Sequence, residues 1–350
     1  MSKDNPFMLS SGRIPPLYID RLFQKNRVIE DFCQEIPSNQ IYMLTGVRGS
    51  GKTVMMTDIE KSLERTGDFI VLNLSIDGKL VEEWASGLYE HPIMKPLFVE
   101  KKLDFSVLGI GVSIEKAEPV SDISAAIRKM LDVAKKIGKK ILIAIDEAVN
   151  NEEMKKFGSL FSIFLRTEYP VFLLMTGLPQ NIYNVINSKT LTFLTRAPKI
   201  VLEPINYTLI RKNYEDVFGL SREESEYMAS LTKGYSFGFQ LLGYLLWEKR
   251  VASPKAGVED VLYEYDARLA EGAYNKVWQD LSDSDRALCR AIADTDGSAS
   301  AIREKLDCNA QNLSNYKKRL ADRGIVMPKT YGVVEFCLPR FKEFIIQSEE

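Results

Sequence analysis

The sequence predicts an α/β fold, in which a five-stranded parallel sheet is followed by a wholly helical region and then by a small segment of helices and a hairpin. Two observations predict the sheet. Residues 141–145 and 171–175 are uninterrupted apolar runs, as expected of parallel strands buried on both faces. A third observation is that residues 122–137 place apolar side chains on one helix face, which predicts a helix leading into the first of these strands.

Taken in order, the strands are expected at residues 41–45, 69–76, 141–146, 171–176 and 199–202, with helical stretches between them. Residues 77–121 are less regular. Within them, residues 105–114 partly alternate between apolar and polar side chains, which predicts a hairpin insertion. These elements form the expected first domain, residues 1–205.

Residues 206–280 have a helical pattern throughout and are expected to form a second domain, a lid. One of its helices is expected to begin with a capping box, in which Ser221 and Glu224 satisfy each other's backbone N–H groups. The other helices are expected over residues 207–218, 236–249 and 257–278.

Residues 281–350 follow a different pattern and are expected to form a third domain. Ser282 and Asp285 can cap a first helix, and further helices are expected over residues 298–306 and 309–323. Two short strands, 325–327 and 333–337, flank a turn at 328–332. Three helices followed by a hairpin predict a winged helix-turn-helix.

The composition is that of an ordinary folded protein with several domains. The 350 residues are 45% hydrophobic and 27% charged, with a net charge of −2, so any nucleic-acid contact requires a local basic patch. Apolar runs are far shorter than the roughly 20 residues of a membrane span, and the N-terminus does not resemble a secretion signal, so we expect a cytosolic protein without a membrane partner. Four widely spaced cysteines and a single histidine argue against structural zinc and histidine catalysis.

The residues that indicate chemistry lie between the first expected strand and the helix after it. They read Gly46, Val47, Arg48, Gly49, Ser50, Gly51, Lys52 and Thr53, a G-x-x-x-x-G-K-T pattern. Such glycines let backbone N–H groups surround a polyphosphate, and the following helix N-terminus adds partial positive charge. Lys52 then reaches the β and γ phosphates and Thr53 offers a hydroxyl to Mg²⁺, which predicts a site for ATP and Mg²⁺.

Acidic residues follow the third expected strand. Asp146 is placed to hold the Mg²⁺ shell, and Glu147 is the candidate base that polarises the attacking water. The alternative is a solvated pair that caps the next helix. At the end of the fourth strand, Thr176 is the candidate for a γ-phosphate sensor, and its alternative is an ordinary turn residue.

Arg196 lies in the loop before the last expected strand. Its permanent planar charge suits stabilisation of a transferring phosphoryl group on a neighbouring subunit, although a plain surface arginine fits the sequence equally well.

The third helix of the C-terminal segment and the hairpin turn carry candidate DNA contacts. In a winged helix this third helix enters the major groove. The segment holds as many acidic as basic side chains, and winged helices also dock proteins, so a packing module with a solvated basic face is the alternative. The candidates are Gln311, Asn312, Asn315, Lys317, Lys318, Arg319 and Lys329.

Together these motifs resemble AAA+-type P-loop ATPases, specifically small prokaryotic ATP-binding proteins similar to archaeal origin-recognition ATPases and to STAND signalling ATPases. Residues 5–7, 12–16 and 19–21 are similar to the leader and the adenine-side box of that family, which implies that Arg21 contributes to nucleotide binding. Arg196 falls in its arginine-finger region. The family's lid helix opens with Gly-x-Pro and, in the initiator branch, a sensor arginine, whereas residues 234–240 contain no arginine; this favours slow turnover.

The leading hypothesis is an ATPase that hydrolyses ATP to ADP slowly and acts as a DNA-associated switch. A STAND-like signalling or assembly ATPase whose winged helix binds protein is the alternative, and a homo-oligomer is compatible with both. A metabolic kinase is less favoured, because no substrate-binding lid beyond the helices is apparent.

Overall fold

A computed structural model describes residues 4–100, 103–104, 106–111, 120 and 122–348. Contacts divide the chain into two compact units. One comprises Arg21–Thr45 and Lys52–Val201, and the other comprises Met1–Asp20, Gly46–Gly51 and Leu202–Glu350. Each unit therefore combines stretches that are far apart in the sequence, whereas the expected domains 1–205, 206–280 and 281–350 are consecutive.

The first unit contains the predicted parallel sheet. Among the described residues its five strands are ordered β2-β3-β4-β1-β5, and every neighbouring pair is parallel. The central strands are buried on both faces, as their apolar runs predict. The strands are β1 (Ile41–Thr45), β2 (Phe69–Leu74), β3 (Lys140–Ile145), β4 (Val171–Gly177) and β5 (Lys199–Val201).

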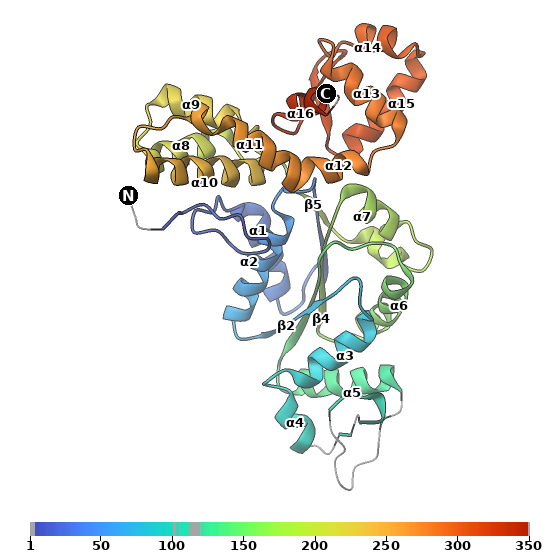
Figure 1. Cartoon of the computed structure of the whole chain (residues 1–350). Coiled ribbons are helices and arrows are strands. Elements are labelled where there is room, and N and C mark those ends of the chain that lie inside the picture. Colours follow the sequence, from blue (N-terminus) through green and yellow to red (C-terminus); the bar gives the residue numbers. More distant parts are fainter. Residues whose placement is uncertain (1–3, 101–102, 105, 112–119, 121, 349–350) are drawn as a thin grey trace. The chain divides into compact units, whose positions relative to one another are not determined.

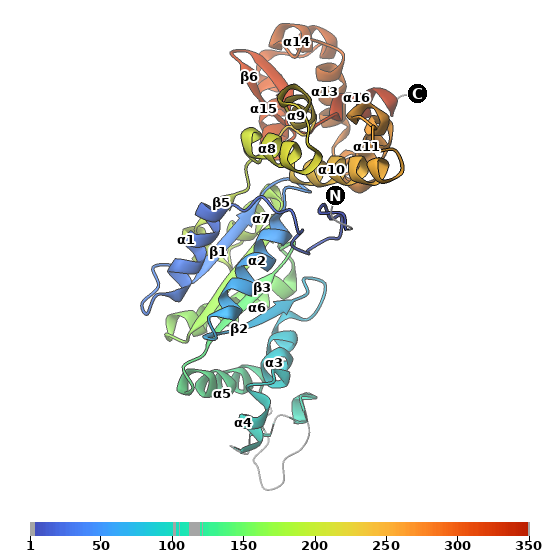
Figure 2. The ribbon, with the colours of Figure 1, turned by 90° about the vertical axis from the view of Figure 1, so that its left-hand side faces the viewer.

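Helices cover both faces of this sheet (Figure 1). On one face α1 and α2 lie side by side (Figure 2), and Phe32 of α1 packs against Tyr42 of β1 and Phe172 of β4. On the other face, apolar side chains of α3, α5, α6 and α7 form one cluster with the alternate residues of the strands. The helices of this unit are α1 (Leu22–Cys33), α2 (Lys52–Arg65), α3 (Leu80–Glu90), α4 (Lys95–Glu100), α5 (Ile123–Lys136), α6 (Glu152–Arg166) and α7 (Pro179–Ile186), with 3₁₀ turns η1 (Ser106–Leu108) and η2 (Thr192–Arg196).

The expected hairpin insertion at residues 105–114 is not found where the chain is described. Residues 106–108 form the 3₁₀ turn η1, and Gly109 and Gly111 have φ angles of +74° and +71°, which an extended strand does not adopt. Residues 105 and 112–114 of this prediction lie outside the described residues.

The second unit contains the predicted lid. Its helices are α8 (Tyr207–Phe218), α9 (Arg222–Ser230), α10 (Ser236–Ala252), α11 (Leu262–Leu269) and α12 (Asn275–Gln279), with η3 (Val258–Val261) and η4 (Ala270–Tyr274). The predicted capping box at the start of α9 is confirmed. Phe7, from the N-terminal stretch, packs between the rings of Phe218 and Phe239.

The predicted helix over residues 257–278 is interrupted. It begins as a 3₁₀ turn, and η4 is a turn of π-helix between α11 and α12. Gly272 in this turn allows close approach of Phe237, since a Cβ there would lie 2.8 Å from the Phe237 ring. Tertiary packing against a glycine, which periodicity does not show, accounts for the irregularity.

The C-terminal segment (residues 281–348) has the predicted order of three helices and a hairpin, and its interpretation as a winged helix stays a prediction. Strand β6 runs through Pro328 and Thr330 with an irregular register, so the turn is confined to Tyr331 and Gly332 and is shorter than expected. The elements are α13 (Asp283–Ala293), α14 (Ala299–Leu306), α15 (Ala310–Asp322), β6 (Val326–Thr330), β7 (Val333–Phe336) and α16 (Phe341–Gln347).

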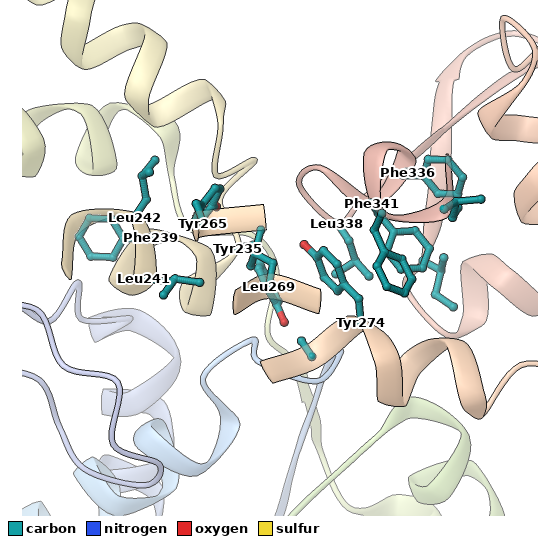
Figure 3. Close-up of a cluster of buried hydrophobic side chains, with 14 of the residues drawn as sticks. Tyr235, Phe239, Leu241, Leu242, Tyr265, Leu269, Tyr274, Phe336, Leu338 and Phe341 are labelled. Carbon is teal, nitrogen blue, oxygen red and sulfur yellow. The ribbon is translucent and has the colours of Figure 1, made fainter. Parts of the chain in front are cut away.

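The lid and the C-terminal segment share one hydrophobic core. Figure 3 shows its junction, where Tyr235 and Tyr274 of the lid face Leu338 and Phe341 of the C-terminal segment. The Tyr274 hydroxyl donates a 2.5 Å hydrogen bond to the carbonyl of Pro339 at the same junction. Because this core is continuous, the lid and the C-terminal segment pack against each other and are not joined by a flexible linker alone.

Candidate functional site

The glycine loop, Gly46–Gly51, connects β1 to α2. Gly49 and Gly51 have φ angles of +75° and +92°. These are left-handed values that a residue with a Cβ rarely adopts, so glycine is required at both positions. The loop therefore has the alternating backbone that lets successive N–H groups form an anion-binding concavity.

Three consecutive carbonyls of the glycine loop are hydrogen-bonded by the start of α10. The Tyr235 hydroxyl donates to the Arg48 carbonyl at 2.7 Å, and the Phe237 N–H donates to Gly49 at 3.0 Å. The Ser236 hydroxyl donates to the Ser50 carbonyl at 2.9 Å. Sequence reasoning singled out this stretch only for its missing arginine, and nothing in the pattern indicates these contacts.

Lys52 and Thr53, the first two residues of α2, follow the loop directly. Lys52 is 9% exposed. The Thr53 hydroxyl donates a 2.8 Å hydrogen bond to Oδ2 of Asp146, which lies just beyond the end of β3. The two residues expected to serve the same Mg²⁺ ion thus lie side by side, although they are 93 positions apart in the sequence.

The other carboxylate oxygen of Asp146 is also engaged. The Thr176 hydroxyl donates to Oδ1, and the backbone N–H of Glu147 donates to the same oxygen at 3.0 Å. The Glu147 N–H also reaches the Thr176 hydroxyl at 3.3 Å. Thr176 is fully buried at the end of β4, so its hydroxyl is a fixed part of this cluster and not a turn residue at the surface.

Glu147 has an unusual backbone conformation. Its φ is +53°, in the left-handed region, and its side chain is exposed. Strained positions of this kind recur at functional sites, where surrounding structure maintains them. Here the hydrogen bonds from the Glu147 N–H to Asp146 and Thr176 hold it, and its carboxylate extends from the end of the sheet where strands of α/β proteins carry their ligands.

The chemistry of the donors suits Mg²⁺. Thr53 and Asp146 offer hard oxygen ligands 2.8 Å apart, close to the roughly 2.9 Å between adjacent ligands in an octahedron with bonds of about 2.05 Å. No group of three or more His, Cys, Asp or Glu side chains gathers elsewhere in the described part of the chain to hold a metal. A site with one carboxylate and one hydroxyl is typical of Mg²⁺ that is completed by phosphate oxygens and water.

Two predicted nucleotide contacts lie outside this cluster. Arg196 ends the 3₁₀ turn η2 before β5, and its side chain is exposed. Arg21 is half-buried at the N-cap position of α1, where its carbonyl accepts from Lys25.

The candidate DNA contacts belong to α15 and the hairpin. Most are exposed, and Lys317 is partly exposed. Arg319 differs, because it forms hydrogen bonds to the buried Asp285 carboxylate at 2.7 and 3.0 Å and stacks on Tyr316. Its guanidinium is therefore held within the segment. Apart from Arg319, the exposed candidates are Gln311, Asn312, Asn315, Lys318 and Lys329.

Glu60 of α2 is a buried acid that sequence reasoning missed. It is 7% exposed, and its Oε1 has no hydrogen-bond partner. The pKa of Glu60 is raised to about 7, mainly by burial and also by the charges of Glu64 and Asp146, while a hydrogen bond from Asn73 opposes the shift. Its spacing could have revealed it, because Glu60 lies four residues after Met56 and three before Leu63 on the apolar face of α2.

Sequence comparisons find distant relatives. A family model described as a domain of unknown function, DUF8462, matches residues 271–345. An uncharacterised ABC transporter ATP-binding protein of Bacillus subtilis, YcbN, is 26% identical over 182 residues, which is 45% of this chain. The chain spans 59% of the length of that relative.

Solved structures resemble nearly the whole chain. The Walker-type ATPase paby2304 of Pyrococcus abyssi matches with a TM-score of 0.66 at 15% identity, covering 97% of this chain and 99% of that one. The chain shares the fold of that protein. A second match supports this assignment: the ORC2 protein of Aeropyrum pernix, solved as ADPNP-ADP complexes, has a TM-score of 0.63 at 12% identity and 97% coverage of both chains. At these identities the likeness shows the fold alone.

No helix in the described part of the chain is both long enough and apolar enough to cross a bilayer.

Proposed function

We propose that this protein binds ATP with Mg²⁺, hydrolyses it slowly and acts as a nucleotide-dependent switch. The observation that carries the proposal is the cluster at the end of the sheet, where the Thr53 hydroxyl lies 2.8 Å from Asp146 and Thr176 holds the other carboxylate oxygen. Thr53 directly follows a G-x-x-x-x-G-K sequence in a chain with the AAA+ P-loop fold. A cluster of oxygen donors that begins with the residue after the G-x-x-x-x-G-K sequence matches what a magnesium–triphosphate complex requires.

Each residue of the cluster has a role in this proposal. Lys52 binds the β and γ phosphates, and Glu147 orients and deprotonates the attacking water. Thr176 fixes the Asp146 carboxylate through its hydroxyl. A Mg²⁺ ion held by Thr53 and Asp146 would neutralise charge on the phosphates as the bond to the leaving group breaks.

The proposed slow turnover rests on the absence of an arginine from the part of the lid that contacts the glycine loop. Residues 235–237 offer two hydroxyls and a backbone N–H to the glycine loop, and no arginine occurs from residue 234 to residue 240. Charge that develops on the transferring phosphoryl group therefore receives no cation from this stretch. The exposed Arg196 would supply one to a neighbouring subunit, which makes faster turnover dependent on homo-oligomer formation.

The C-terminal segment is the proposed winged helix, and duplex DNA is its proposed partner. Helix α15 presents exposed amides and Lys318, and the hairpin presents Lys329 beside its tip. Amide and lysine side chains are suited to base edges and phosphates respectively. Because the Arg319 guanidinium is held by Asp285, the proposed phosphate contacts come from Lys317, Lys318 and Lys329.

A specific observation favours the alternative, a STAND-like ATPase whose winged helix binds protein. The hairpin exposes two large apolar side chains, Met327 at 40% and Tyr331 fully. Exposed aromatic and methionine side chains are enriched at protein interfaces. Nucleotide-dependent self-association in the absence of DNA binding would favour this function.

Calorimetry with ATP and Mg²⁺ tests the nucleotide half of the proposal. We expect Lys52→Ala to weaken ATP binding at least about tenfold, because a charged hydrogen bond to phosphate is lost. Glu147→Gln should bind ATP as the wild type does and lower the hydrolysis rate by about 10² to 10⁴. The matched control is Lys61→Ala, an exposed lysine on the same helix, which should change neither property.

Two results would contradict the proposal in different ways. If the wild-type protein takes up no ATP or ADP at millimolar Mg²⁺, nucleotide binding is excluded. If Glu147→Gln hydrolyses ATP at the wild-type rate, binding stands but Glu147 is not the base.

A further inference from the structure

The start of α10 contacts the glycine loop in a one-to-one pattern. Tyr235, Phe237 and Ser236 donate to the carbonyls of residues 48, 49 and 50 respectively. Two of the three donors are side-chain hydroxyls, so the pattern depends on the identities of these residues. We call residues 235–237 the carbonyl clamp.

Because of peptide geometry, the carbonyl clamp also sets the direction of the backbone N–H groups in the glycine loop. A trans peptide is planar, so its C=O and its N–H point in opposite directions. Holding the carbonyls of residues 48, 49 and 50 therefore directs the N–H groups of Gly49, Ser50 and Gly51 away from α10. The Ser50 N–H closes a turn onto the Val47 carbonyl at 3.2 Å, which fixes the loop further.

The carbonyl clamp is built into the packed interior of this unit. Tyr235 is 5% exposed, and a Cβ on Gly49 would lie 2.1 Å from its hydroxyl oxygen. Burial raises the pKa of Tyr235 well above its usual value, so the hydroxyl keeps its proton and remains a donor. Phe237 is anchored on the opposite side against Gly272 of the π-helical turn.

We propose that Tyr235 and Ser236 are positioning residues for phosphate binding, which act by holding the glycine loop so that the N–H groups of Gly49 and Gly51 are directed toward the nucleotide. This rests on the proposed function. The residues need not touch the nucleotide; they act through the peptide planes of the glycine loop. A loop held in this way has less conformational entropy to lose when a polyphosphate binds, so removing a donor weakens binding.

The test measures affinity for two ligands that share only their phosphates, ADP and inorganic pyrophosphate. Tyr235→Phe removes one hydroxyl and keeps the ring, and Ser236→Ala removes the other hydroxyl. We expect each variant to bind both ligands about fivefold more weakly, the equivalent of one hydrogen bond. The double variant should lose about 25-fold if the two bonds act independently.

Tyr214→Phe is the matched control. Its hydroxyl donates a 2.7 Å hydrogen bond to the carbonyl of Phe239, a bond of the same type and length as that of Tyr235, and both rings are buried in the lid. This variant weakens the lid without touching the glycine loop, so it should leave both affinities unchanged.

The outcomes separate the two proposals. Absence of ADP and pyrophosphate binding by the wild-type protein overturns the proposed function itself. If the wild type binds and Tyr235→Phe and Ser236→Ala bind equally well or more tightly, the positioning role is wrong. A loss for ADP alone, or an equal loss in Tyr214→Phe, also overturns it, because either result would indicate a general effect on the lid.

Discussion

At the scale of single residues, Asp146 is fixed by its neighbours rather than by its own strand. Its two carboxylate oxygens accept hydrogen bonds from Thr53, Thr176 and the Glu147 backbone. These donors come from α2, β4 and the turn after β3. Because the carboxylate is held from three directions, its orientation is set before any ligand arrives, which reduces the cost of organising the site.

Glu60 provides a residue-scale prediction about pH. Its pKa is 4.5 in an unfolded chain and about 7 in the folded protein. Between these values the unfolded state has lost the proton that the folded state keeps, so the unfolded state binds fewer protons and stability falls as pH rises from about 4.5 to 7. At pH 8 the cost approaches about 3 kcal/mol as an upper limit.

Glu60→Gln removes this titration while keeping the shape of the side chain. Urea unfolding at pH 8 should show a gain of about 1 to 3 kcal/mol over the wild type, and the gain should be largely absent at pH 4.5. Glu35→Gln, which neutralises an exposed acid that does not contribute to the pKa shift of Glu60, should show no such pH-dependent gain. An equal gain for Glu60→Gln at both pH values would contradict the assignment.

At the scale of elements, α15 divides its cations between structure and solvent. Arg319 pairs with Asp285 of α13, whose carboxylate is 1% exposed. Lys318, the preceding residue, points to solvent. Neighbouring residues on a helix face different directions, about 100° apart, so one basic pair serves both packing and surface charge.

This division predicts different effects for two alanine substitutions. Arg319→Ala leaves a buried carboxylate without its cation and should lower the free energy of unfolding by about 2 kcal/mol, below the usual range for buried pairs because the Arg319 side chain is 46% exposed. Lys318→Ala should change it by less than about 0.5 kcal/mol. Chemical denaturation measures both.

The double variant Arg319→Ala with Asp285→Asn checks the cause. Neutralising Asp285 removes the unpaired charge, so part of the lost stability should return. If the second substitution instead adds its own full cost, the ion pair is not the source of the effect.

At the scale of the whole molecule, the C-terminal segment contacts both the lid and the glycine loop close to the carbonyl clamp. Lys233, two residues before Tyr235, donates a 2.9 Å hydrogen bond to the Phe336 carbonyl at the end of β7. Val47 of the glycine loop also packs closely against Gly324, where a Cβ would lie 2.3 Å from the Val47 side chain. These contacts connect the C-terminal segment to the lid and to the glycine loop, which is the kind of physical connection that the proposed switch would use.

Binding of duplex DNA by the C-terminal segment is the corresponding prediction. Replacing Lys317, Lys318 and Lys329 with alanine should weaken binding and lower the slope of log affinity against log salt by up to about 2.7, since each phosphate contact contributes about 0.9. Replacing the exposed lid residues Lys212, Lys249 and Lys255 should leave the slope unchanged. Equal effects of the two sets would exclude the basic face of α15 and the hairpin.

The sequence by itself determined most of the strands and helices and their order, but not the 3₁₀ turn η1 in place of a hairpin or the interruption of the helix over residues 257–278. Apolar runs placed β1, β3 and β4, because strands buried on both faces require unbroken apolar residues. It also predicted that Thr53 and Asp146 act together, from the pattern of glycines and lysine and from an acid after a buried strand, and the structure places the two side chains 2.8 Å apart.

The tertiary structure alone decided which residues support that site. The contacts of Tyr235 and Ser236 with the glycine loop join positions more than 180 residues apart, and the Arg319–Asp285 pair joins two helices. Such contacts depend on where whole elements pack. Hydrophobic periodicity shows which face of a helix is buried but not what that face meets, and polar partners across a core leave no periodic signal in the chain.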